Sequence, residues 1–261
     1  MIVLKNKQEQ AIMREAGQIL AKVLAALEKM VLPGVTTLEL EEKADKMITE
    51  AGAVASFRGQ PGMTVNAPPF PAATCISVNE QVIHGIPSNR VIKEGDIVSI
   101  DCGVTWRGFI ADSAISVVAG KADPDVDRLV SVTRKSLLAA IKTALPGRHL
   151  HDLSFAIQSW AVNEGLGIVK DFCGHGVGRS LHEDPPIPNY GKPGTGPLLR
   201  PGMTLAVEPM FNLGTGKVKM LKDGWTVVTA DGKPSAHWEH TLLITDGPAE
   251  VLTWRPGEVE G

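Results

Sequence analysis

Two aspartates stand in a segment that alternates apolar and polar residues in the manner of a β-hairpin. The segment is IVSIDCGVTWRGFIADSAISVV, and its turn is expected at residues 105–108. A turn centred in that range places Asp101 and Asp112 directly opposite each other on one face of the sheet. Two like charges so close together are destabilising unless a positive ion lies between them, and a divalent cation is the simplest such ion.

Taken alone, this pair has a simpler interpretation, in which one aspartate is a turn or edge residue and the register is shifted by one. Three further segments favour a metal site. In DFCGHGVGRSLHEDPP, a strand-like run over residues 167–172 precedes His175, and His182 follows it. The glycines on both sides of His175 allow close approach to a metal or substrate. A lone histidine is more often a core residue than a ligand, so this segment needs the other two.

Two glutamates complete the set. Glu208 ends the apolar strand MTLAVEP, where an unpaired buried carboxylate is costly and must either be neutralised or bind a cation. Glu239 lies in SAHWEHTLLIT, which is expected to be the return strand of a closing hairpin that turns at residues 231–233. On that strand Glu239 shares a face with His237, whereas His240 points to the other side.

Four carboxylates and one histidine suit two hard divalent metals that prefer oxygen ligands, and they argue against a structural zinc site. Carboxylates that bridge two ions roughly 3.5 to 4 Å apart hold a shared water and lower its pKa. The product is a hydroxide that can attack an amide. The residues therefore predict a two-metal hydrolase.

Four helices are expected to support these strands. The first, over residues 7–31, has an apolar stripe at helical spacing; the second opens with the capping-box pattern Thr36-Thr37-Leu38-Glu39 and ends near Gly52. Asp123-Pro124 predicts the start of a third, and a fourth ends at Gly165. The two helix pairs share three positions at a constant spacing of 113 residues: Pro33 and Pro146, Leu40 and Leu153, Gly52 and Gly165.

The repetition extends into the strands. Segment 92–101 (IKEGDIVSID) matches segment 199–208 (LRPGMTLAVE), and each ends in a carboxylate. One interpretation is generic patterning in two helix-helix-strand units. The other is a duplicated α/β unit, with Asp101 and Glu208 at equivalent places near a pseudo-two-fold axis. We predict the second: a single catalytic domain over residues 1–261, with an internal repeat of roughly 7–120 and 123–245.

The composition of the 261 residues narrows the class of protein. Apolar residues make up 43% of the chain, enough for a large folded core. The 26 basic and 29 acidic residues give a formal charge of −3 without any block of like charge, so no nucleic-acid or membrane partner is expected. The N-terminus does not resemble a signal peptide, and three scattered cysteines suit a reducing cytoplasm.

Five segments, in this order, each resemble a signature of the type I methionine aminopeptidases: CISVNEQVIHGIP, SIDCGVTWRGFIADSA, CGHGVGRSLHEDP, MTLAVEPM and SAHWEHT. The resemblance covers nearly the whole chain. It implies an α/β (α+β) pita-bread fold, in which two pseudo-symmetric halves form a curved, mainly antiparallel sheet covered by helices. It also implies that the protein removes the N-terminal methionine from nascent proteins whose second residue is small, with a hydroxide that bridges two divalent metals.

The resemblance assigns roles to the metal-binding residues. Asp112 and Glu239 would bridge the two ions, Asp101 would bind one metal, and His175 and Glu208 would bind the other. The metals would be cobalt, manganese, iron or zinc. Glu208 would also act as the general base.

The resemblance assigns the substrate site as well. His84 and His182 would contact the substrate and would transfer protons or stabilise the developing oxyanion. Considered alone, His84 could be an ordinary turn residue and His182 an ordinary solvent-exposed residue. The methionine side chain would lie against a soft, partly aromatic wall formed by Phe70, Cys75, Leu181 and Trp225. This chain departs from better-known members in the long proline-rich loop over residues 58–74 and in having Tyr190 as its single tyrosine.

Two other functions are considered. Aminopeptidase P and prolidase share the fold but carry a sizeable extra N-terminal domain, and here the first helix is expected near residue 7. A metal-free binding module of the same fold would lack ligand residues, and all five are present. The expected partners are the N-termini of nascent polypeptides at the ribosome, and the protein is expected to be a cytoplasmic monomer.

Overall fold

The computed structural model describes residues 1–62 and 67–258. Its four α-helices are α1 (Lys7–Glu28), α2 (Thr37–Glu50), α3 (Pro124–Thr143) and α4 (Leu150–Asn163). The predicted helix starts are confirmed: Thr36 and Glu39 form a capping box before α2, and the Asp123 side chain caps α3 ahead of Pro124. The first helix ends at Glu28, three residues before the predicted limit of 31.

Fifteen strands form four sheets, and all of their pairings are antiparallel within the described ranges. The first sheet holds β1 (Val54–Ala55), β2 (Thr74–Val78), β4 (Ile97–Trp106) and β5 (Phe109–Val118). A five-stranded sheet holds β7 (Gly174–Gly176), β8 (Glu183–Ile187), β9 (Thr204–Val207), β14 (His240–Leu243) and β15 (Glu250–Val251).

The two remaining sheets have three strands each. One joins β6 (Gly167–Ile168), β10 (Met210–Asn212) and β13 (Ser235–His237), and the other joins β3 (Gln81–Ile83), β11 (Val218–Met220) and β12 (Val227–Thr229). Backbone hydrogen bonds between Ala114 of β5 and Glu239 link the first sheet to the segment between β13 and β14. The strands of both halves of the chain therefore form one curved layer.

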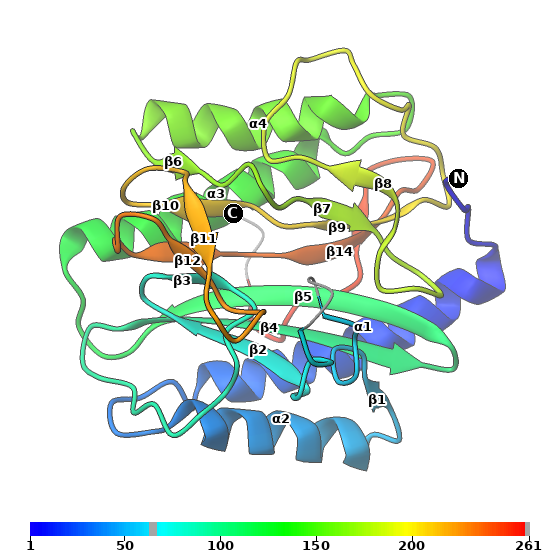
Figure 1. Cartoon of the computed structure of the whole chain (residues 1–261). Coiled ribbons are helices and arrows are strands. Elements are labelled where there is room, and N and C mark those ends of the chain that lie inside the picture. The colour runs from blue at the N-terminus through cyan, green and yellow to red at the C-terminus, as the bar shows by residue number, and fades with distance from the viewer. Residues whose placement is uncertain (63–66, 259–261) are drawn as a thin grey trace.

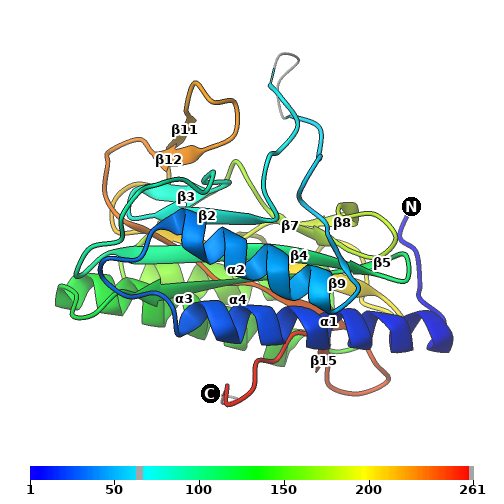
Figure 2. The ribbon, with the colours of Figure 1, turned by 90° about the horizontal axis from the view of Figure 1, so that it is seen from below.

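The helices cover this layer, as Figure 1 shows, with α1 and α2 beyond β4 and β5, and with α3 and α4 at the opposite end of the view. Figure 2, turned by 90°, shows α1, α3 and α4 along one side of the strands and α2 in front of them, with loops and the short strands β11 and β12 on the other side. Leu20, Leu24 and Leu27 of α1 are fully buried against the sheet, as are Leu129 of α3 and Leu153 of α4. This is the expected pita-bread arrangement of helices over an antiparallel sheet.

The β4–β5 hairpin differs from the predicted register. Its two-residue turn is Arg107-Gly108, with both φ values positive (46° and 79°), so the turn is centred one residue later than expected. Asp101 therefore lies opposite Ala114, and Asp112 lies opposite Gly103. The two aspartates remain on one face of the sheet, but they are diagonal neighbours and not direct partners.

Two other strand predictions need correction. The segment that contains Trp225 does not form a hairpin with the strand that precedes Glu239, because β12 pairs with β3 and β11, whereas β13 pairs with β10. The strand-like run over 167–172 shortens to Gly167–Ile168. β12 does form a local hairpin with β11, but its other partner, β3, and the partner of β6, which is β10, come from distant parts of the sequence. Local turn signals therefore did not determine these pairings.

The two halves show corresponding features. The turns before β4 and β9 contain Gly95 and Gly202, which both adopt positive φ (83° and 92°). The division of a single catalytic domain into related halves of roughly 7–120 and 123–245 stays a prediction. Among the residues described, no helix has both the length and the apolar character that crossing a bilayer requires.

Candidate metal centre and active site

A cavity of about 330 Å³ opens where the two halves of the sheet meet. It contains all eleven side chains that the sequence predicted for the site: Phe70, Cys75, His84, Asp101, Asp112, His175, Leu181, His182, Glu208, Trp225 and Glu239. These residues come from segments up to 169 positions apart (Phe70 to Glu239), so only the tertiary fold brings them together. Six further residues line the cavity: Phe57, Gln60, Pro61, Ile83, Phe172 and Cys173.

The five predicted metal ligands are presented by four neighbouring backbone segments. Asp101 and Asp112 come from the β4–β5 hairpin, and His175 comes from β7, where it lies opposite Ala206 of β9. Glu208 follows two residues after Ala206 and therefore projects from the same side of β9 as Ala206. Glu239 is held by its backbone N–H, which donates to the Ala114 carbonyl at 2.9 Å.

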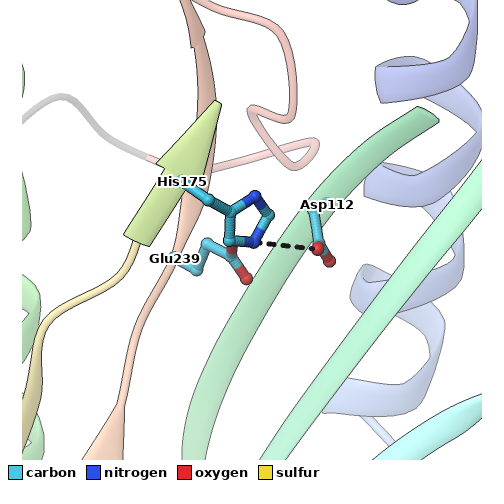
Figure 3. Close-up of side chains that lie close together, drawn as sticks. All are labelled: Asp112, His175 and Glu239. Carbon is cyan, nitrogen blue, oxygen red and sulfur yellow. Dashed lines mark ion pairs between the residues drawn. The ribbon is translucent and has the colours of Figure 1, made fainter. Parts of the chain in front are cut away.

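Three of these side chains converge closely, as Figure 3 shows. Asp112, His175 and Glu239 each offer one ligand atom, and these atoms all lie within 4.8 Å of one another. His175 Nε2 is 3.9 Å from Asp112 Oδ2 and 3.6 Å from Glu208 Oε1. The three converging side chains are buried, whereas Asp101 and Glu208 are partly exposed to the cavity.

Three buried oxygen atoms of this cluster lack a hydrogen-bond donor in the described part of the chain. Asp101 Oδ1, Asp112 Oδ1 and Glu239 Oε1 are buried, and none has a hydrogen-bond partner among the residues described. A buried carboxylate without a donor is costly, because the protein replaces none of the hydration that it has lost. A divalent cation would satisfy these oxygens, and the donor set of four carboxylates and one imidazole fits a hard cation site.

Electrostatics agree with this interpretation. Burial raises the pKa of Asp112 to about 7. Burial also raises the pKa values of Asp101, Glu208 and Glu239 well above their ordinary range, and the charge of Asp112 raises all three further. Burial lowers the pKa of His175 to about 4, so its imidazole is neutral near pH 7 and can bind a metal.

The two other predicted histidines, His84 and His182, also line the cavity. His182 stacks edge-on against His175, with ring centroids 4.5 Å apart. His84 directly follows β3 in a left-handed conformation (φ 58°) that is uncommon for a residue other than glycine and is typical of functional sites. Its Nδ1 is buried without a partner in the described part of the chain, and burial lowers its pKa to about 4.

The apolar end of the cavity is formed by the predicted wall. The rings of Phe70 and Trp225 meet edge-on with centroids 5.0 Å apart, and Trp225 Nε1 donates to the Pro68 carbonyl at 2.8 Å. Cys75 and Leu181 are buried beside them in the same apolar cluster. Part of the proline-rich loop over 58–74, residues 63–66, lies outside the described residues. The rest of this loop adds Gln60 and Pro61 to the cavity lining.

A further histidine beside the acidic cluster was not among the predicted candidates. His237 is 1% exposed, and its Nε2 lies 3.5 Å from Glu208 Oε2, whereas His175 approaches Glu208 Oε1. Burial lowers its pKa to about 3. The sequence did contain a signal for it, because His237 was predicted to share a face with Glu239. His240 points elsewhere, as predicted: its Nδ1 is 2.8 Å from Thr253 Oγ1.

Comparisons with known proteins identify relatives along nearly the whole chain. The chain is 49% identical over 253 residues to a methionine aminopeptidase from Clostridium perfringens, an alignment that covers 97% of this chain and 99% of the relative. Methionine aminopeptidase 1 of Bacillus subtilis is 47% identical, with the same coverage of both chains. The crystal structure of a methionine aminopeptidase from Thermotoga maritima superposes with a TM-score of 0.93 at 44% identity, over 97% of this chain and 99% of that one.

More distant structures share the fold alone. Prolidase from Pyrococcus furiosus gives a TM-score of 0.74 at 22% identity, and this chain covers 66% of it. A model of metallopeptidase family M24 matches residues 11–246, which is nearly the whole chain and spans every residue of the predicted metal site. The chain therefore belongs to metallopeptidase family M24.

Proposed function

We propose that this protein is a methionine aminopeptidase, which hydrolyses the peptide bond after an N-terminal methionine. One observation carries the proposal. The same cavity holds a cluster of side chains that could bind metal ions and an apolar pocket formed by a thiol and two aromatic rings. The similarity to methionine aminopeptidases over nearly the full length supports it. The substrates are the N-termini of newly made proteins, and we extend the proposal to a cytoplasmic monomer that acts at the ribosome.

The substrate would bind with its methionine side chain in the apolar end of the cavity. Phe70 and Trp225 offer ring faces and edges, and Cys75 offers a polarisable sulfur, a combination that favours a thioether. Because Trp225 Nε1 already donates to Pro68, the indole presents no free donor to the substrate. This wall would therefore select a flexible apolar side chain and exclude a charged one.

The acidic end of the cavity would hold two divalent cations. Asp101, Asp112, His175, Glu208 and Glu239 would bind them, and Asp112 and Glu239 lie within the closest group of ligand atoms. When bound, the cations would supply Lewis acidity to the scissile carbonyl and to a water molecule. The buried oxygens without protein partners support this assignment.

Three residues would handle protons and charge during hydrolysis. Glu208 would accept a proton from the attacking water as its oxygen bonds to the carbonyl carbon, and would pass that proton to the nitrogen of the leaving peptide as the C–N bond breaks. His84 and His182 would donate to the carbonyl oxygen as it gains negative charge. His84 can do so as a neutral imidazole, because its pKa lies near 4.

Cleavage of short peptides tests the function against its rivals. The purified protein is expected to release methionine from Met-Ala-Ser and to leave Ala-Pro and Ala-Pro-Ser intact. Cleavage of the Ala-Pro peptides in preference to Met-Ala-Ser would indicate a proline-directed enzyme of the same fold. Binding of peptides without cleavage, at full metal occupancy, would indicate a binding module.

A further inference from the structure

The N-terminal segment, residues 1–5, lies against the loop that carries two residues of the substrate site. Figure 1 shows the N-terminus beside β8, where the chain leaves the 177–182 loop between β7 and β8. This loop supplies Leu181 and His182 to the cavity. The segment and the loop are far apart in the sequence, so their contact is a tertiary feature of the fold.

A buried ion pair joins the two segments. Lys5 Nζ lies 2.6 Å from Glu183 Oε2, and the two side chains are 3% and 13% exposed. The lysine backbone is held independently: its N–H donates to the Gly202 carbonyl, and its carbonyl accepts from the Gln10 side chain at 2.7 Å. The position of Lys5 is therefore fixed by its backbone hydrogen bonds, and its side chain holds Glu183 through the ion pair.

The same glutamate closes the loop. Glu183 Oε1 accepts hydrogen bonds from the backbone N–H groups of Arg179 and Ser180, at 2.7 and 3.2 Å. Leu181 and His182 lie between these donors and Glu183 in sequence. The hydrogen bonds of the Glu183 carboxylate therefore enclose these two residues in a tight loop. The absent side chain of Gly178 leaves the space that the Lys5 ammonium occupies, since a Cβ there would come within 2.7 Å of Nζ.

The loop has further contacts with the body of the protein. The Gly178 carbonyl accepts from Ile110 N–H at 2.7 Å, and Arg179 lies over the Phe109 ring and pairs with Glu9 of α1 at 3.1 Å. These contacts hold the start of the loop, residues 178–179. The end of the loop, next to His182, is held by Glu183. A buried carboxylate that loses its counter-charge must move toward water or take up a proton, and either change releases the loop.

We infer that Lys5 and Glu183 are positioning residues for the substrate site, which fix Leu181 against the methionine side chain and His182 beside the scissile carbonyl. The inference rests on the proposed function for the substrate that is positioned. Catalysis is sensitive to displacements of about 1 Å, which can cost on the order of a hundredfold in rate. Loss of the pair is expected to lower kcat/KM by about 10- to 100-fold while the five metal-binding side chains keep their places.

The experiment compares Lys5→Met, Lys5→Arg, Glu183→Gln and the double variant Lys5→Met/Glu183→Gln with a control, Arg14→Met. Arg14 also forms an ion pair from the N-terminal part of the chain, with Glu250 at 2.7 Å, but this pair is about 40% exposed and does not involve the 177–182 loop. For each protein, kcat and KM on Met-Ala-Ser, bound metal, and hydrogen exchange of residues 177–182 are measured.

We expect Lys5→Met to lower kcat/KM, to speed hydrogen exchange in the loop and to retain the metal content of the wild type. Lys5→Arg should recover most of the activity, and the double variant should lose about as much as the worse single variant, because the two residues act as one unit. Arg14→Met should match the wild type. Equal kcat/KM and equal loop exchange in Lys5→Met and Arg14→Met would overturn the inference, as would losses in the single variants that multiply in the double variant.

Two further outcomes are decided by the same data. If Lys5→Met is too unstable to purify, Lys5→Arg and Glu183→Gln take its place, and wild-type exchange rates in both overturn the inference. If the wild type does not cleave Met-Ala-Ser, the proposed function fails, and loop exchange alone decides: faster exchange in Lys5→Met than in Arg14→Met supports the positioning role, and equal exchange overturns it.

Discussion

Asp101 and Asp112 lie diagonally across the β4–β5 hairpin on the same face, with Asp101 opposite Ala114 and Asp112 opposite Gly103. Each has one buried oxygen that no donor of the described chain satisfies. Because Ala114 also exchanges backbone hydrogen bonds with Glu239, the diagonal arrangement brings a third carboxylate to the same point. The acidic cluster is therefore built into the sheet and cannot relax by moving one side chain.

The metal-free protein is expected to become less stable as the pH rises above 6.5. The pKa of Asp112 is raised to about 7, and those of Asp101, Glu208 and Glu239 are raised well above their ordinary values. In the unfolded chain these groups ionise near pH 4, so above that pH the folded state binds more protons and loses stability as the pH rises. Each carboxyl that is still protonated contributes a loss of about 1.4 kcal/mol per pH unit.

The buried histidines act in the opposite direction. The pKa values of His84 and His175 are lowered to about 4, and that of His237 to about 3. Because the unfolded chain takes up protons on these histidines more readily than the folded chain does, the free energy of unfolding falls as the pH drops below about 6.5. Above that value the histidines are neutral in both states and have no further effect on stability. The range from pH 6.5 to 8 therefore isolates the carboxylates. Urea unfolding of the chelated protein at pH 6.5, 7.2 and 8 measures the trend, which saturating metal should abolish. A chelated protein that gains stability over this range would contradict the prediction.

Variants should separate metal binding from proton handling. Asp112→Asn and Glu239→Gln are each expected to lower both bound metal and kcat, because a shared carboxylate neutralises charge on two ions. His84→Ala should keep its metal and lose about a hundredfold in kcat, which is at the lower end of the rate loss that usually follows removal of a proton-transferring residue. Asp125→Asn, on the exposed first turn of α3, is the matched control. Metal analysis and peptide kinetics decide; equal metal loss in His84→Ala and Asp112→Asn would show that the assignment of roles is wrong.

The sequence predicted the elements that carry strong local signals. The capping box at Thr36 and the Asp123-Pro124 start of α3 both appear in the structure, since caps depend on residues within one turn of the helix. The five metal-ligand candidates were recognisable because carboxylates in apolar strands are costly unless they bind something. His84, His182 and the residues of the methionine wall were predicted only from the family resemblance. These signals do not depend on register.

The features that failed depend on distant contacts or on unusual backbone. The hairpin turn places Arg107 at φ 46°, a conformation that is uncommon for arginine and that the sequence therefore did not predict. The strand that follows Trp225, β12, pairs on one side with β3, more than a hundred residues away, and no turn motif could predict that pairing. Within the 58–74 loop, Phe70 was predicted to line the cavity, whereas the contribution of Gln60 and Pro61 required the fold.

Residues 255–258 contact His240, which directly follows Glu239 in the sequence. Glu258 bonds Arg255 Nη2 at 2.5 Å and lies 3.5 Å from both His240 Nε2 and Arg134 Nη2. The Arg255 and Glu258 side chains are 4% and 5% exposed. Glu258→Gln would leave the buried Arg255 guanidinium with only the more distant Glu28 carboxylate, 4.0 Å away, so we expect a loss of about 3 kcal/mol in the free energy of unfolding.

Urea unfolding in the presence of metal checks this value. Glu164→Gln is the control, because Glu164 pairs with Arg128 at a surface where both side chains are more than a third exposed. That change should cost less than about 1 kcal/mol. Similar small losses in both variants would show that the C-terminal ion pair does not stabilise the fold.

The residue after methionine is expected to be small. A bulky side chain there would press on the wall near His84 and His182 and push the carbonyl away from the acidic cluster. Such a displacement affects the transition state, so kcat/KM for Met-Ala-Ser should exceed that for Met-Leu-Ser by on the order of a hundredfold or more. Peptides of equal length at saturating metal make the comparison. Similar kcat/KM values would leave the aminopeptidase activity in place but remove the role in processing new proteins.

The most direct test of the account is methionine release after removal and return of metal. The protein is treated with chelator until metal analysis finds none, and Met-Ala-Ser hydrolysis is then measured before and after addition of cobalt, manganese, iron or zinc, one at a time. The account predicts no turnover without metal and recovery with at least one of the four, with binding to the cluster lost in Asp112→Asn. Full turnover by the protein shown to be free of metal would contradict it.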